Sequence, residues 1–152
     1  MISKVGFQTS EYHVPPHKFE AGTPNIAGAV GLHAALDYLD ALGRKAIHAH
    51  DTDLAAYAKE RLAEFYGIRI FGPTEDRGGL VSFVFENVHA LDLATMADQQ
   101  GVAIRIGHHC TQPLHEKLGV PATARASFYF YNTRTEVDRF IEVLQKVIQL
   151  LK

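Results

Sequence analysis

The chain of 152 residues has one cysteine, no long apolar run and little net charge, and each shortage excludes a class of protein. A lone thiol, Cys110, cannot form a disulfide within the chain, so its value lies in packing or in reactivity. A formal net charge of −2 argues against nucleic-acid binding, which needs a basic surface. No segment approaches the roughly 20 apolar residues of a membrane span. With no signal-peptide pattern at the start, we expect a cytoplasmic protein without nucleic-acid or membrane partners.

Length and composition predict an ordinary globular domain. The apolar fraction of 47% and the charged fraction of 21% are typical values. A chain of this length can bury roughly 70% of its unfolded surface, which is enough for a core without disulfides. Because no internal repeat or low-complexity tract divides the sequence, we expect a single domain over residues 1–152.

Periodicity and end signals predict helices followed by a mixture of strands and helices. Thr23 and Pro24 are typical of a helix start and Gly43 of a helix end. We expect helices over residues 25–42, 47–66, 90–100, 112–118 and 135–151, the last one capped by Thr135. We expect strands over residues 4–7, 68–71, 80–85, 102–106 and 125–131. This order favours the α+β class, with a small, mostly antiparallel sheet and helices packed on one face.

The surroundings of Cys110 favour a reactive thiol. Two imidazoles, His108 and His109, precede it directly, and Arg105 lies five positions earlier. Nearby cations favour the thiolate, which is the nucleophilic form of cysteine. A buried, inert cysteine is the alternative interpretation. A metal site with His115 is disfavoured, because the spacing lacks a regular pair of zinc ligands.

Two further segments have both an ordinary and a functional interpretation. Thr23, in the segment from Phe19 to Asn25, needs no role beyond capping a helix. Arg125, at the head of a predicted strand, would be an ordinary ion-pair partner. A guanidinium also offers two parallel donors that match a carboxylate, so Arg125 is a candidate for binding an acidic group.

Three motifs in this order resemble one family, and the resemblance extends over essentially all 152 residues. They are Phe-Glu-Ala-Gly-Thr-Pro-Asn at 19–25, Arg-Ile-Gly-His-His-Cys at 105–110 and Ala-Arg-Ala-Ser at 124–127. They are similar to the SUF-type (group II) cysteine desulfurases and selenocysteine lyases of the class V aminotransferases. The resemblance implies the small, C-terminal domain of a fold-type I enzyme that uses pyridoxal phosphate.

The resemblance also implies a role for each motif. Cys110 would accept sulfur as a persulfide while L-cysteine becomes L-alanine, and L-selenocysteine would serve likewise. Arg125 would bind the substrate carboxylate, and Arg105 and His109 would shape the substrate site. Thr23 would donate its hydroxyl to the cofactor phosphate across a homodimer interface. The enzyme-bound sulfur would pass to an acceptor protein for iron–sulfur cluster assembly.

The family's large cofactor-binding domain has no counterpart in this sequence. Lys18 follows a histidine, as the cofactor lysine of the family does. It lies directly before the motif that contains Gly-Thr-Pro, however, whereas the family's cofactor lysine lies well upstream of that motif. The Schiff-base lysine is therefore expected to be absent, and the chain alone is expected to be inactive. The alternative function is a standalone sulfur carrier or partner-binding module that uses Cys110.

Overall fold

The computed structural model describes residues 1–73 and 77–151, and the chain falls into two compact units, Met1–Gly43 and Arg44–Lys152. The expectation of a single domain stays a prediction. Among the described residues, every helix is too short or too polar to cross a lipid bilayer.

The first unit holds a small hairpin and one long helix. Its elements are β1 (Ile2–Val5), β2 (Ser10–Tyr12), the 3-10 helix η1 (His17–Phe19) and α1 (Ile26–Leu42). Strands β1 and β2 pair in antiparallel fashion. The expected strand at residues 4–7 therefore lies slightly earlier in the chain and gains a partner that the sequence did not predict.

The two ends of α1 test the predicted start and stop signals. The helix is capped by Asn25, whose Oδ1 accepts a hydrogen bond from the Gly28 N–H at 2.9 Å. Capping by Thr23 is therefore wrong, because an amide side chain two residues later reaches the free N–H groups first. The stop at Gly43 is confirmed: this residue has φ of 88°, and its N–H donates to the Leu39 carbonyl at 3.0 Å.

Helix α1 keeps its apolar side chains exposed. Among the described residues, none of the helix is buried, and Leu32 of the expected apolar stripe is 62% exposed. The predicted helix is present, but no other segment of this unit packs over its apolar stripe.

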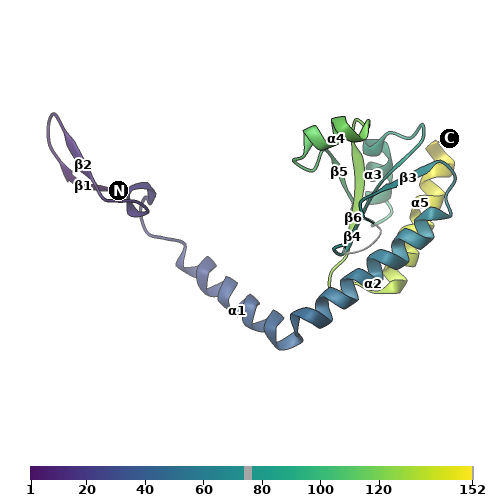
Figure 1. Cartoon of the computed structure of the whole chain (residues 1–152), viewed down its shortest axis with the longest axis horizontal. Coiled ribbons are helices and arrows are strands. Elements are labelled where there is room, and N and C mark those ends of the chain that lie inside the picture. The colour runs from purple at the N-terminus through teal and green to yellow at the C-terminus, as the bar shows by residue number, and fades with distance from the viewer. Residues whose placement is uncertain (74–76, 152) are drawn as a thin grey trace. The chain divides into compact units, whose positions relative to one another are not determined.

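The second unit is a four-stranded sheet with helices (Figure 1). Its elements are α2 (Arg44–Ala63), β3 (Ile68–Phe71), β4 (Leu80–Phe85), α3 (Ala90–Asp98), β5 (Arg105–Gly107), α4 (Gln112–Leu118), β6 (Thr123–Ser127) and α5 (Arg134–Leu151). The strands lie in the order β3-β4-β6-β5, and every neighbouring pair is antiparallel. Helices α2 and α3 contact the sheet, and α5 contacts both helices. The α+β prediction is confirmed.

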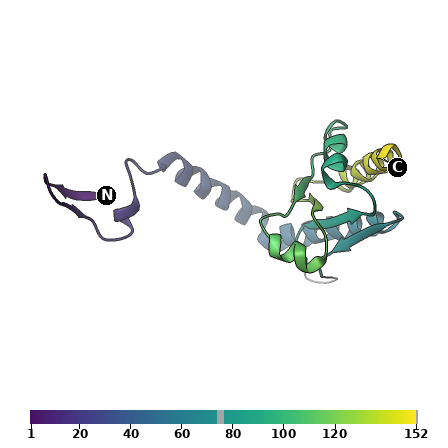
Figure 2. The same ribbon diagram turned by 90° about the horizontal axis from the view of Figure 1, so that it is seen from above.

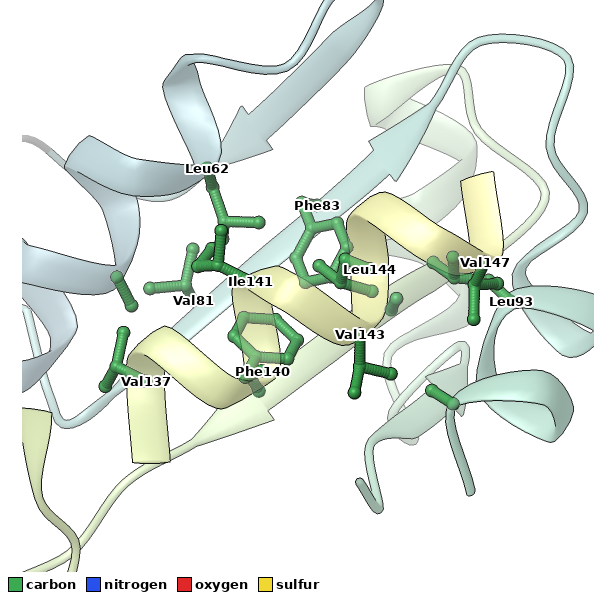
Figure 3. Packing of buried hydrophobic residues seen from close by; sticks show 14 of the residues in the cluster. Leu62, Val81, Phe83, Leu93, Val137, Phe140, Ile141, Val143, Leu144 and Val147 are labelled. Atoms are coloured by element: carbon green, nitrogen blue, oxygen red, sulfur yellow. The ribbon is translucent and has the colours of Figure 1, made fainter. Parts of the chain in front are cut away.

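The core lies between the sheet and these helices. Along β4, Val81, Phe83 and Phe85 are buried in strict alternation, as expected for a strand with one covered face. Figure 3 shows Ile141 and Leu144 of α5 against Phe83. Each such side chain contributes about 1.5–3 kcal/mol when it is buried completely. The clear helical periodicity of residues 137–151 is thus explained by burial against β4.

Helix α4 lies apart from this core. It follows the β5 strand and is separated from α5 in both views of the chain (Figures 1 and 2). Its bounds match the predicted helix at 112–118, and Gly119 ends it in the left-handed conformation with φ of 67°.

Two predicted boundaries are wrong near the end of the chain. The strand expected at residues 125–131 is β6, Thr123–Ser127, because the Asn132 Oδ1 accepts the Tyr129 N–H at 2.8 Å and turns the chain. The cap of α5 is Thr133, not Thr135. The Glu136 carboxylate accepts the Thr133 N–H at 2.7 Å, and the Thr133 hydroxyl accepts the Glu136 N–H at 3.3 Å.

Candidate functional site

Two arginines lie directly opposite each other on neighbouring strands of the sheet. Arg105 of β5 pairs in register with Arg125 of β6, and Arg125 pairs with Ser82 of β4. Paired residues project from the same face of an antiparallel sheet. Phe83, the next residue along β4, is buried in the core, so both arginines belong to the face that α2, α3 and α5 leave uncovered.

This pairing of like charges is unfavourable by itself. Equal charges directly opposite on two strands destabilise a sheet. Within the described part of the chain, neither Arg105 nor Arg125 forms an ion pair with a carboxylate. The buried Nε of Arg125 also has no hydrogen-bond partner there. Among the described residues Arg125 thus has no carboxylate partner, and the arrangement suits a bound anion.

The thiol stands on a tight turn directly after β5. Cys110 is exposed, which contradicts the interpretation as a buried, inert cysteine. His109 and Cys110 both have positive φ, at 51° and 65°. This conformation costs about 1–2 kcal/mol for each residue that is not glycine, so the turn is held by other contacts. The Thr111 N–H and hydroxyl both donate to the His108 carbonyl at 2.8 Å.

Arg105 connects the turn to the arginine pair. Its Nη2 donates to the Cys110 Sγ at 3.8 Å, a distance suited to a hydrogen bond to sulfur. The sequence predicted a cation near this thiol, and the structure brings Arg105 there. A positively charged donor thus lies at hydrogen-bonding distance from the sulfur.

His109 lies behind the thiol and is partly buried. Burial lowers the pKa of its imidazole below the usual 6.5, and the positive charges of Arg125 and Arg105 act in the same direction. Its Nε2 lies 2.9 Å from the Thr123 hydroxyl and 3.2 Å from the Thr123 carbonyl oxygen. The side chain is therefore neutral at neutral pH and tied to the first residue of β6.

Two residues of this cluster were not predicted as site residues. His115 of α4 and Thr123 are both buried, and the His115 Nε2 lies 3.1 Å from the Thr123 hydroxyl. The His115 ring also lies 5.5 Å from the ring of His108, centroid to centroid. A buried histidine in a short helix gives no periodic signal, so sequence reasoning named His115 only as a disfavoured metal ligand.

The structure thus brings together four of the five predicted site residues, Cys110, Arg105, Arg125 and His109. Thr23 belongs to the first unit and is exposed in the bend before α1. Three or more histidine, cysteine or acidic residues in metal-binding geometry do not occur among the described residues.

Known cysteine desulfurases are similar to this chain over nearly all of its length. A cysteine desulfurase from Haloferax volcanii is 54% identical over 151 residues, which cover 99% of this chain and 35% of that protein. A probable cysteine desulfurase from Xylella fastidiosa (strain 9a5c) is 50% identical over 151 residues, covering 99% and 36%. The chain therefore spans little more than a third of the length of these relatives.

Solved structures agree with the sequence relatives. The crystal structure of the cysteine desulfurase CsdA from Escherichia coli matches with a TM-score of 0.87 and 38% identity, over 100% of this chain and 38% of that one. An apo cysteine desulfurase from Thermococcus onnurineus matches with a TM-score of 0.83 and 36% identity, over 97% and 37%. The aminotransferase class-V family matches residues 1–140, and the chain belongs to that family.

Proposed function

We propose that this chain is the thiol-bearing, C-terminal part of a SUF-type (group II) cysteine desulfurase. Such an enzyme converts L-cysteine to L-alanine and keeps the sulfur for iron–sulfur cluster assembly. One observation carries the proposal: the exposed Cys110 sulfur accepts a hydrogen bond from Arg105, which lies directly opposite a second arginine, Arg125. The names of the relatives support the same activity.

The arginine pair is proposed to bind the carboxylate of the substrate amino acid. A carboxylate between two guanidiniums would offset the repulsion of like charges on β5 and β6. It would also give the Arg125 Nε the acceptor that it lacks among the described residues. A guanidinium can hold a carboxylate through two parallel hydrogen bonds, which would orient the rest of the substrate toward Cys110.

The thiol is proposed to take the substrate sulfur. The Cys110 thiolate would form a sulfur–sulfur bond as the carbon–sulfur bond of the substrate breaks. The electron pair of the broken bond would go to the carbon, which takes up a proton to give alanine. Arg105 would stabilise the negative charge on Cys110 before the attack. Selenocysteine offers the same connectivity, with selenium in place of sulfur.

The described residues fit pyridoxal phosphate only in part. The Thr23 hydroxyl is exposed and is not used to cap α1, so it is available for a phosphate oxygen. No lysine takes part in the hydrogen bonds or charge interactions described around Cys110 and His109. The amine that would hold the cofactor is therefore not supplied by this site, and we propose that the chain alone has no desulfurase activity. The complete enzyme would be a cytoplasmic homodimer that passes sulfur to an acceptor protein.

Sulfur transfer from small persulfides tests the proposal without the cofactor. In this exchange the Cys110 thiolate attacks the outer sulfur of the donor, and the donor leaves as its thiolate. Cysteine persulfide carries a carboxylate, whereas cysteamine persulfide lacks one. We expect mass spectrometry to find one added sulfur atom on Cys110, formed faster from cysteine persulfide. In the Arg125→Met variant the two donors should react at equal rates.

Arg69 provides the matched control. It is an arginine of the same sheet, on β3, and its guanidinium donates to the Leu118 carbonyl instead of contacting the thiol. The Arg69→Met variant should keep the preference for cysteine persulfide. Equal rates for both donors in the unaltered chain would contradict carboxylate binding. They would leave a sulfur carrier on Cys110 as the function, and absence of any added sulfur would contradict both.

A further inference from the structure

A continuous chain of polar contacts runs behind the thiol from α4 to β6. The His115 Nδ1 lies 3.1 Å from the Thr111 carbonyl oxygen, and its Nε2 lies 3.1 Å from the Thr123 hydroxyl. The same hydroxyl lies 2.9 Å from the His109 Nε2, which is also 3.2 Å from the Thr123 carbonyl oxygen. His115 is 4% exposed and Thr123 is 2% exposed, so water does not compete for these contacts.

The two carbonyl groups at the ends of this chain determine where its protons lie. A carbonyl oxygen can only accept, so the His115 Nδ1 and the His109 Nε2 both carry hydrogen. A neutral His115 that donates through Nδ1 accepts through Nε2, and the Thr123 hydroxyl must therefore donate to it. The hydroxyl oxygen then accepts from the His109 Nε2. One set of proton positions satisfies every contact, with His109 as the donor at one end.

This arrangement leaves the His109 Nδ1 without a proton. That atom is buried and has no hydrogen-bond partner within the described residues. The positive charges of Arg125 and Arg105 both act on His109, so a bare ring nitrogen is favourable there and a further N–H is not. We infer that His115 and Thr123 are positioning residues, which hold His109 as the Nε2–H tautomer and thereby fix the turn that presents Cys110.

The backbone of the turn explains why such support is needed. His109 and Cys110 are consecutive residues with positive φ, a conformation that ordinary side chains rarely adopt. The contacts of the His109 ring with Thr123 tie the first of these residues to β6. His115 in turn binds Thr111, the residue that follows Cys110. Both sides of the strained pair are thus anchored to the same buried hydroxyl.

Nuclear magnetic resonance of the whole chain tests the inference directly. Two-bond couplings between ring protons and ring nitrogens distinguish the two tautomers of a neutral histidine. Above neutral pH, we expect His109 to show the Nε2–H pattern. In the His115→Leu variant the Thr123 hydroxyl loses its acceptor and turns toward the His109 Nε2. The proportion of the Nδ1–H tautomer should then rise roughly fivefold, the effect of one hydrogen bond.

His115→Gln is the matched control, because its side-chain oxygen can still accept from Thr123. This variant should keep the original tautomer ratio. A dominant Nδ1–H tautomer in the unaltered chain would overturn the inference. Equal ratios in the Leu and Gln variants would overturn it as well.

If the Leu variant does not fold, Thr123→Ser and Thr123→Val provide the second comparison, since the hydroxyl is kept in one and lost in the other. The His109 ring should keep its Nε2–H pattern with serine, whereas valine removes one of the two acceptors of that N–H and should raise the proportion of the Nδ1–H tautomer. Identical proportions in the two variants would refute the inference.

The link to sulfur transfer rests on the proposed function and is measured separately. With cysteine persulfide as donor, the His115→Leu variant should form the Cys110 persulfide roughly fivefold more slowly than His115→Gln. Equal rates would refute the role of His115 in presenting the thiol. If the unaltered chain forms no persulfide, the proposed function fails, whereas the tautomer comparison still decides the assignment of His115 and Thr123.

Discussion

Replacement of Gly79 by alanine probes the contact that joins the start of β4 to the end of β6. A Cβ atom at this position would lie 2.6 Å from the Phe128 carbonyl oxygen and 2.9 Å from the Asp51 Cβ. The first of these neighbours is backbone and cannot rotate away. The Gly79 carbonyl oxygen also accepts the Phe128 N–H at 2.6 Å, so the two segments cannot separate without losing a hydrogen bond.

The magnitude follows from these contacts. Forcing an extra carbon into packed structure costs about 1–3 kcal/mol. Stretching the Phe128 hydrogen bond adds about 1 kcal/mol. Alanine restricts the unfolded chain more than glycine does, which offsets about 0.4–1 kcal/mol. We therefore expect Gly79→Ala to lower the free energy of unfolding of the second unit by about 2 kcal/mol and its Tm by roughly 10 °C.

Gly78→Ala is the control, because a Cβ at Gly78 meets no atom of the described residues within 4 Å. Both variants place the same residue at neighbouring positions, so their comparison removes the general effect of glycine on the unfolded chain. Thermal and urea unfolding followed by circular dichroism would measure the difference. Equal stabilities for the two variants would refute the close approach of Gly79 to Phe128.

The remaining predictions concern the charges at the site and the cap of α5. The lowered pKa of His109 means that the unfolded chain binds more protons, so stability should fall as the pH drops below 6.5. Arg125→Met should raise the His109 pKa, followed by the proton resonances of its ring, whereas Arg69→Met should leave it unchanged; no rise with Arg125→Met would contradict the assigned cause. Thr133→Ala should lower the free energy of unfolding by about 1 kcal/mol in urea titrations. Thr135→Ala should change it by less than about 0.5 kcal/mol, and the reverse order would place the cap at Thr135.

Elements with strong local signals could be predicted from the sequence. The bounds of β3, β4 and α4 match the expected ranges 68–71, 80–85 and 112–118. Each of these segments is short and is followed by a turn or stop residue, such as Gly119 after α4. Local rules therefore sufficed wherever a turn or stop residue next to the element ended it.

Elements whose ends depend on distant contacts could not be predicted in the same way. The aromatic residues 128–131 favour a strand, but the Phe128 N–H is taken by Gly79 and the Tyr129 N–H by Asn132. Their rings pack against each other instead, with Tyr129 and Phe130 centroids 4.7 Å apart. Strand propensity was overruled here by side-chain and backbone contacts across β4 and β6.

The residues of the site divide in the same way, into those that local signals predict and those that depend on distant contacts. Cys110, Arg105, Arg125 and His109 could be named from motifs, because a motif identifies residues by their order in the chain. The roles of His115 and Thr123 depend on the contact between their own side chains, which are 8 residues apart, and on the contact of Thr123 with His109, which is 14 residues away. Such contacts form only when α4 packs beside β6, and no periodic pattern in the sequence predicts them.

The register of the sheet connects the core to the chemistry of the site. Phe83 is paired with Ala124, and the next pair along the strand joins Ser82 to Arg125. Ala124 is small and 1% exposed, which leaves room for the Phe83 ring beneath the helices. A slip of one residue would turn Arg125 into the core and its alanine neighbours outward. Burying an unpaired guanidinium costs several kcal/mol, so the core itself forces the arginine to the open face of the sheet, opposite Arg105.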